Sequence, residues 1–102
     1  MKKLLGLLLG LVLVITLSSC ESKTLIVYTE AGFAPFEYVD GNAIVGVDVE
    51  IMNLVGEKLG KKVKFKNVNF DTIVDVVAQG KLANVGAAGL SITPARQEKV
   101  DF

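Results

Sequence analysis

The spacing of apolar residues along the chain changes between continuous runs, strict alternation and helical periodicity. Residues 25–28 form a continuous apolar run, as expected for a strand that is buried on both faces. Residues 62–66 alternate lysines with apolar side chains, which predicts a strand with one face in water, whose lysines discourage edge-to-edge pairing. Residues 84–88 are mostly small and predict a third strand. These three segments are the main strands predicted for the fold.

The segment between the first strand and the first helix carries turn signals. Glycine and proline interrupt residues 30–35, which are predicted to form a loop. Residues 36–38 and 43–45 flank the pair Asp40-Gly41, which favours the tight turn of a β-hairpin. A short antiparallel hairpin is therefore expected before the first helix.

Three segments carry helix signals. The first helix is predicted to be capped by Asp48 and to end at Gly60. Its predicted core-facing side chains share a spacing of three or four residues: Val47, Ile51, Leu54, Val55 and Leu59. Asp71 to Gln79 is predicted to form a second helix, closed by glycine, and a third is expected over residues 94–100.

Strands and helices alternate in the order strand, hairpin, helix, strand, helix, strand, helix. Such alternation favours an α/β fold with a parallel sheet and helices on its faces. In open sheets of this kind, ligands bind outside the carboxyl ends of the strands. The polar and aromatic candidates for binding all follow those ends: Glu30 and Phe33, then Phe70, then Gly89, Ser91 and Arg96. A single ligand-binding edge is therefore predicted.

The segment before the last helix contains the strongest signal for a ligand. Thr93 followed by Pro94 predicts an N-cap with proline at the first helical position. Arg96 then lies in the first turn, where the helix macrodipole disfavours a cation. An anion bound there would meet backbone N–H groups, hydroxyls and the guanidinium fork together. The alternative is that Arg96 extends into water and pairs with Glu98 or Asp101.

The other candidate residues each allow a structural role as well as a binding role. Ser91 could reach the same ligand if the segment is extended. Gly89 could let the backbone approach a ligand closely, or could only relieve a turn. Phe33 and Phe70 could enclose a planar or apolar side chain, or could pack in the core. Glu30 could recognise a donor on a ligand, or could be a solvated loop residue.

The first residues predict a leader rather than part of the fold. Lys2 and Lys3 precede an apolar run, residues 4–17, that is shorter than the roughly 20 residues of a membrane-spanning helix. Two serines and Cys20 follow, an order that resembles a bacterial lipoprotein processing site. The alternatives are an ordinary signal peptide with a chance cysteine, and a short anchor helix.

The predicted domain boundaries follow from this leader. Residues 1–19 are expected to be a lipoprotein signal peptide, residues 20–23 a lipidated tether, and residues 24–102 the folded domain. Acyl chains on Cys20 would hold the protein at a membrane surface outside the cytoplasm, since each buried CH₂ contributes about 0.8 kcal/mol.

Composition excludes several classes of function for this chain. It has no histidine, which excludes a catalytic histidine and a histidine-based metal site, and its single cysteine allows no internal disulfide. Without the leader's lysines, acidic side chains outnumber basic ones by two, so no basic bias toward nucleic acid remains. Residues 56–62 lack the spacing of a phosphate-binding loop, and Asp48 and Glu50 diverge on a helix. No cofactor and no nucleic-acid partner are expected.

Three segments taken together carry a family resemblance. They are residues 30–37, EAGFAPFE, residues 46–51, GVDVEI, and residues 88–96, AGLSITPAR. In combination they resemble bacterial extracellular solute-binding proteins of the polar amino-acid ABC-transporter class, family 3. The family often has aspartate where Glu30 stands, and an aromatic or larger aliphatic residue where Val47 stands.

The resemblance implies a type II periplasmic-binding fold, of which residues 24–102 are the N-terminal part of lobe 1. It implies an amino-acid-binding component of an ABC importer that works with a permease. Ser91 and Arg96 would hold the α-carboxylate of a polar amino acid, and Gly89 would offer backbone to its α-amino group. Three further residues would meet the ligand's side chain: Phe33, Phe70 and, as a determinant of selectivity, Glu30.

Family members continue for more than another such length, across a hinge and into a second lobe. The chain is therefore expected to be a truncated fragment that is marginally stable and binds free amino acids weakly or not at all. The competing hypotheses are an enzyme on the same fold, such as a cyclohexadienyl dehydratase-like protein, the sensor module of a receptor, and a lipoprotein stub that binds nothing.

Overall fold

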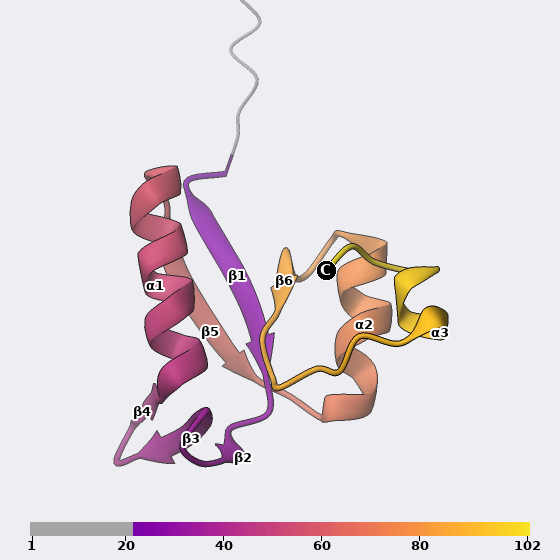
Figure 1. Cartoon of the computed structure of the whole chain (residues 1–102). Coiled ribbons are helices and arrows are strands. Elements are labelled where there is room, and N and C mark those ends of the chain that lie inside the picture. The colour runs from indigo at the N-terminus through magenta and orange to yellow at the C-terminus, as the bar shows by residue number, and fades with distance from the viewer. Residues whose placement is uncertain (1–21) are drawn as a thin grey trace, which may run out of the picture.

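The computed structural model of the chain describes residues 22–102 (Figure 1). The predicted leader, residues 1–19, and the predicted acylation site at Cys20 lie outside the described residues. Within that range, strands and helices alternate, as expected for the predicted α/β class. None of the helices in the range is long and apolar enough to cross a membrane.

The main sheet of the described residues has parallel strands in the order β5-β1-β6. They are β1 (Thr24–Thr29), β5 (Lys62–Asn67) and β6 (Val85–Gly86). β1 pairs with β5 along its whole length, whereas only two residues of β6 pair with it, so the third strand is shorter than predicted. The side chain of Asn84 takes over part of the pairing, because its Oδ1 accepts the N–H of Ile26 at 2.8 Å in place of a backbone carbonyl.

Helices α1 (Val47–Leu59) and α2 (Phe70–Gln79) cover opposite faces of the main sheet (Figure 1). Successive residues of β1 point to different helices, since side chains alternate along a strand. Two clusters of buried residues result, one of Leu25, Val27 and Met52 and the other of Tyr28, Ile73, Ala83 and Ala88. The prediction that the first strand is buried on both faces is confirmed.

Helix α1 turns a different face to the sheet from the one predicted. Its buried positions are Val49, Met52 and Gly56. A Cβ at Gly56 would lie 2.3 Å from Cγ2 of Val63, so a residue without a side chain lets the helix approach β5 closely. The predicted core-facing side chains are exposed instead: Val47, Ile51, Leu54, Val55 and Leu59. The prediction was wrong because the helix meets β5 through Gly56, which has no apolar side chain to mark it, and this contact turns the face with Val49 and Met52 inward.

Helix α1 begins at Val47, and its N-cap is Gly46 rather than the predicted Asp48. The first two N–H groups of the helix donate to the carbonyl oxygens of Pro35 and Phe36, at 3.0 and 2.9 Å. Backbone from the preceding loop therefore does the work of a capping side chain. Gly46 has a φ of 130°, and a Cβ there would lie 2.3 Å from the Phe36 oxygen, so glycine is required at this junction.

A small antiparallel sheet, β2-β3-β4, lies beyond the carboxyl end of β1 (Figure 1). Its strands are β2 (Gly32–Phe33), β3 (Glu37–Asp40) and β4 (Ala43–Val45). β3 and β4 pair around the predicted tight turn, which confirms the hairpin. The segment predicted as a loop contains β2, which adds a third strand to the hairpin.

Side-chain caps begin the other two helices. Asn69 Oδ1 accepts the N–H of Asp71 at 2.9 Å, and α2 starts one residue earlier than predicted. Thr93 Oγ1 accepts the N–H of Arg96 at 3.2 Å, which confirms the predicted cap. Helix α3 (Pro94–Gln97) is shorter than predicted, because the chain continues from it into turns.

Candidate functional site

A cavity of about 340 Å³ lies where β1, the segment after β5 and the segment after β6 converge. Its wall contains four of the six predicted binding residues: Glu30, Phe33, Phe70 and Gly89. The other lining residues are Gly32, Glu37 and Ala88. The cavity is therefore at the carboxyl edge of the parallel sheet, where ligands of such sheets bind.

Ser91 and Arg96 lie beside this cavity rather than in its wall. The guanidinium carbon of Arg96 lies 5.5 Å from the centre of the Phe70 ring, and its Nη1 donates to the carbonyl oxygen of Ser91 at 2.8 Å. The ring and the carbonyl together orient the guanidinium. Neither Glu98 nor Asp101, nor any other carboxylate of residues 22–102, forms an ion pair with it. The remaining donors of the fork are available to an anion.

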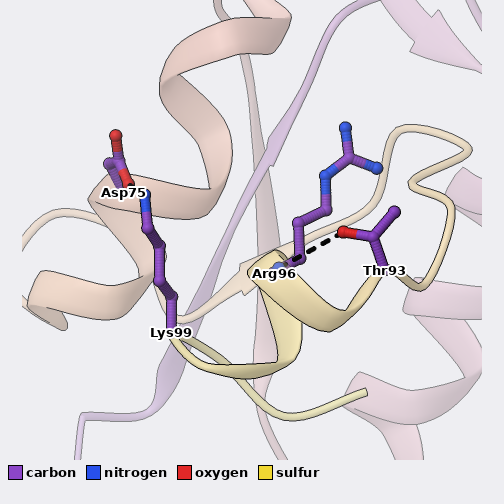
Figure 2. Close-up of polar contacts among 4 residues, drawn as sticks. All are labelled: Asp75, Thr93, Arg96 and Lys99. Carbon is purple, nitrogen blue, oxygen red and sulfur yellow. Dashed lines mark hydrogen bonds and ion pairs between the residues drawn. The ribbon is translucent and has the colours of Figure 1, made fainter.

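Helix α3 is held by contacts that leave this guanidinium alone. Thr93 caps the helix, and Lys99 pairs with Asp75 of α2 at 2.7 Å. Figure 2 shows the Arg96 side chain pointing away from the Lys99–Asp75 pair. The two basic residues of the α3 segment therefore have separate contacts: Lys99 anchors the segment to α2, and Arg96 lies over Phe70 beside the cavity.

Phe33 and Gly89 lie against each other in the cavity wall. Phe33 is 52% exposed, and its ring centre lies 5.1 Å from that of Phe36, which is its hairpin neighbour. Gly89 has a φ of 58°, and a Cβ there would lie 3.0 Å from the Phe33 ring. Gly89 thus makes a turn and also permits a close approach, and the group that approaches it is the aromatic ring.

The carboxylate of Glu30 is anchored at the N-terminus of α2, where Oε2 accepts the N–H of Phe70. An anion is favoured at this end of a helix by the macrodipole. Glu30 is exposed and lines the cavity, so a ligand can reach its carboxylate while the helix fixes its position. A hydrogen bond to the helix therefore fixes the position of this exposed loop carboxylate.

Two further acidic residues belong to the site, and sequence reasoning did not select them for it. Glu37 in β3 lines the cavity and is only 1% exposed. Asp48, in the first turn of α1, accepts the N–H of Gly89 at 3.2 Å. Burial, together with the hydrogen bond and the charge of Asp48, raises the pKa of Glu37 from 4.5 to about 7.

The signal for Glu37 lies in the alternation of residues 36–38. Phe36 and Tyr38 share one face of the hairpin and Glu37 has the other. Sequence reasoning favours burying the aromatic face, but the structure exposes both rings in part and buries the acid. The acid's face is the one that meets α1 and the segment around Gly89, a contact that only the assembled fold creates.

The charges around the cavity suit a small zwitterionic or cationic molecule. The wall carries two acidic side chains and no basic one, and the guanidinium of Arg96 lies next to it. A carboxylate would therefore find its partner on one side and a cationic group on the other. Within residues 22–102, no three histidine, cysteine, aspartate or glutamate side chains gather in a way that could hold a metal ion.

Residues 25–102 match the model of the bacterial extracellular solute-binding proteins, family 3. The chain belongs to this family. The match confirms the resemblance drawn from residues 30–37, 46–51 and 88–96, and it implies a location outside the cytoplasm. Solved relatives with TM-scores of 0.73 and 0.72 include an arginine-specific periplasmic binding protein of Salmonella typhimurium, which confirms the predicted fold class.

Several similar proteins have names that describe amino-acid binding. The "Arginine-binding extracellular protein ArtP" of Bacillus subtilis is 32% identical over 111 residues, which covers 100% of this chain and 43% of the relative. The structure of "an ancestral arginine-binding protein bound to arginine" superimposes with a TM-score of 0.73 at 43% identity, covering 78% of this chain and 35% of that one. The chain thus spans about two-fifths of the length of ArtP and of a second similar protein, from Escherichia coli.

Two other solved structures bear on the competing hypotheses. The arginine-bound form of domain 1 from TmArgBP, a single domain, has a TM-score of 0.68 and 34% identity, covering 74% of this chain and 60% of that one. An ancestral cyclohexadienyl dehydratase has a TM-score of 0.70 and 31% identity, covering 78% and 33%. Binding proteins and an enzyme therefore share this fold, although the similar curated relatives are binding proteins.

Proposed function

We propose that the chain is part of the amino-acid-binding component of an ABC importer and that its ligand is a cationic amino acid, with L-arginine the first candidate. The observation that carries this proposal is the guanidinium of Arg96, which is held over Phe70 with donors left for a carboxylate, beside a cavity whose wall is acidic. The names of the arginine-binding relatives support the choice of ligand.

In this proposal each wall of the site binds a different part of the ligand. Arg96 receives the α-carboxylate, with the Ser91 hydroxyl beside it. Gly89 offers its carbonyl oxygen to the α-ammonium, because its N–H is already held by Asp48. The aromatic rings of the wall contact the ligand's side chain. Glu30, fixed at the N-terminus of α2, receives the cationic end.

We further propose that a second lobe completes the site in the functional protein. Small ligands gain affinity by being enclosed, and typical pockets bury most of a ligand's surface. One lobe covers one side only, so the missing wall would supply an acidic partner for the ammonium. The arginine-bound single domain of TmArgBP supports the proposal that one lobe retains some binding. We expect the chain to bind at least a hundredfold more weakly than the two-lobed protein.

Calorimetry with four chosen compounds tests the ligand. L-arginine should bind, and agmatine, which lacks the α-carboxylate, should lose the contribution of Arg96. L-citrulline, which has the shape of arginine without its charge, should lose the contribution of Glu30. D-arginine is the stereochemical control. Equal affinity for L-arginine and agmatine would contradict the assigned role of Arg96, and no binding of any amino acid by the two-lobed protein would contradict the function.

The proposed location is the outer face of the cell membrane, with Cys20 acylated and residues 1–19 removed. The order of basic, apolar and small residues before the cysteine supports this, and acyl chains would keep the protein near its permease. Mass spectrometry of detergent-extracted protein should show a lipid-modified residue 20 at the mature N-terminus. A mature N-terminus elsewhere, with an unmodified cysteine, would contradict the anchor.

An enzyme of the cyclohexadienyl dehydratase type is the second candidate. Likeness to the ancestral dehydratase supports it, as does Glu37, a cavity carboxyl whose pKa is raised to about 7, the range suited to general acid catalysis. Incubation with a carboxylated cyclohexadienol should then release carbon dioxide, water and an aromatic product, the last detected by its ultraviolet absorbance. Turnover without arginine binding would favour the enzyme, and arginine binding without turnover the transporter component.

A further inference from the structure

Three parts of the fold meet at one buried acidic side chain. Glu37 comes from β3, Asp48 from the first turn of α1, and Gly89 from the segment after β6. Glu37 is 1% exposed, and its Oε1 lies 3.9 Å from the position that a Cβ of Gly89 would occupy. The acid is therefore packed inside a junction and is not a surface group.

The hydrogen bonds of this junction do not balance if both acids are ionised. Oε2 of Glu37 is buried and has no donor among the described residues. Asp48, whose carboxylate helps to raise the pKa of Glu37, reaches the same junction through Gly89: it accepts the N–H of Gly89 at 3.2 Å and is therefore an acceptor as well. A buried acceptor without a donor is strongly disfavoured, and a second carboxylate beside it adds repulsion. One proton on Glu37 removes both problems, because it converts an acceptor into a donor for Asp48.

The surroundings place that proton on Glu37 and not on Asp48. Asp48 lies in the first turn of α1, where the macrodipole favours an anion, and it accepts an N–H. Glu37 has neither advantage and is desolvated, in line with its raised pKa. The other ionisable group in the cavity wall is Glu30, which is also acidic, while Arg96 lies over Phe70 and donates to the Ser91 carbonyl.

We propose that Glu37 is a positioning residue of the binding cavity: its protonated carboxyl donates to Asp48, and Asp48 in turn holds the main-chain N–H of Gly89 at the cavity wall. The inference rests on the proposed function only in taking this cavity as the ligand site. Loss of the proton above neutral pH leaves two carboxylates side by side, and the hold on Gly89 weakens. This chain of hydrogen bonds from Glu37 through Asp48 to Gly89, the Glu37 bridge, thus makes the shape of the cavity wall dependent on pH.

Nuclear magnetic resonance of the ligand-free protein between pH 5 and pH 9 tests the bridge. We expect the Glu37 carboxyl carbon to titrate near pH 7 and the Gly89 amide to shift with the same midpoint. Glu37→Gln, which keeps a donor but cannot ionise, should abolish the inflection at Gly89. Asp40→Asn, at the exposed end of β3, is the matched control and should leave it unchanged. Should Glu37→Gln fail to fold, the titration of the native protein alone still decides.

Two results would overturn the inference: a Glu37 carboxyl that titrates near its ordinary 4.5, or a Gly89 amide that does not follow it. Calorimetry with L-arginine over the same pH range separates this from the proposed function. We expect the affinity to fall at least threefold between pH 6 and pH 8.5, with the fall absent in Glu37→Gln. Coupled titration without arginine binding would support the bridge and contradict the function. Arginine binding with a Gly89 amide that does not titrate would support the proposed function and contradict the bridge.

Discussion

The two sides of the cavity accommodate charge in opposite ways. On one side, the guanidinium of Arg96 keeps its charge without a carboxylate partner, because an aromatic face and one carbonyl orient it and part of it meets water. On the other side, Glu37 is buried among acceptors and is satisfied only by holding a proton and donating it in a hydrogen bond to Asp48. Solvent access decides between the two solutions, since an ion removed from water needs a partner or must become neutral.

This difference separates binding from assembly. The Arg96 guanidinium keeps N–H donors that can bind a ligand. Glu37 and Asp48 instead form their hydrogen bonds with other parts of the fold. Substitutions that disrupt the Glu37–Asp48 pair should therefore change the stability of the protein and the shape of the site. Substitutions of Arg96 should change the affinity for the ligand and leave the fold intact.

The largest effect is expected from Gly46→Ala. A Cβ there would overlap the Phe36 oxygen, at 2.3 Å, and the backbone is in a region that other residues avoid. The turn that brings Asp48 beside Glu37 would be lost, at a cost of at least about 3 kcal/mol of unfolding free energy. Urea denaturation measures it. Gly32→Ala is the control, because a Cβ at Gly32 meets nothing within 4 Å, and equal stability losses would contradict the argument.

Glu37→Gln should change how stability depends on pH. Because the pKa of Glu37 is raised in the folded state, the folded protein binds more protons than the unfolded one between pH 4.5 and about 7. The part of the free energy of unfolding that Glu37 contributes therefore declines as pH rises through that window, by about 3 kcal/mol in total. The variant should lack this decline. Denaturation curves at pH 5 and pH 8 check the prediction, and parallel losses in both proteins would refute it.

Arg96→Ala should weaken arginine binding by the two-lobed protein by roughly tenfold to a hundredfold, since a hydrogen bond to a charged group contributes about 1.5–3 kcal/mol. Arg96→Lys should recover only part of it, because the bidentate fork is lost. Calorimetry provides the affinities and denaturation shows that the fold is kept. Unchanged affinity in both variants would remove Arg96 from the site.

The smallest effect is expected from Lys99→Ala, which removes the basic residue that anchors the α3 segment to α2. Its ion pair with Asp75 joins two side chains that are more than half exposed, so the loss of unfolding free energy should be about 0.5 kcal/mol or less. Affinity for arginine should stay within twofold, which makes the variant a matched charge control for Arg96→Ala. A large loss of affinity would mean that the two cations act together.

Local patterns predicted the parts of the fold that depend on near neighbours. The buried run of β1, the alternation of β5, the hairpin turn and the Thr93 cap all follow from residues a few positions apart. The convergence of Glu30, Phe33, Phe70 and Gly89 on one cavity also follows, because parallel strands end at the same edge. The family was recognisable from the same segments.

Contacts between distant segments decided the rest. The face of α1 that packs on the sheet depends on Val63 meeting Gly56, and its cap depends on carbonyls at residues 35 and 36. The burial of Glu37 exists only once β3, α1 and the segment at Gly89 are assembled. Sequence by itself determined which residues prefer strand, turn or helix, and which candidate residues gather at one edge of the sheet. Tertiary structure alone decided which side chains lose water, and hence which acid must hold a proton, because desolvation depends on the whole packed surroundings.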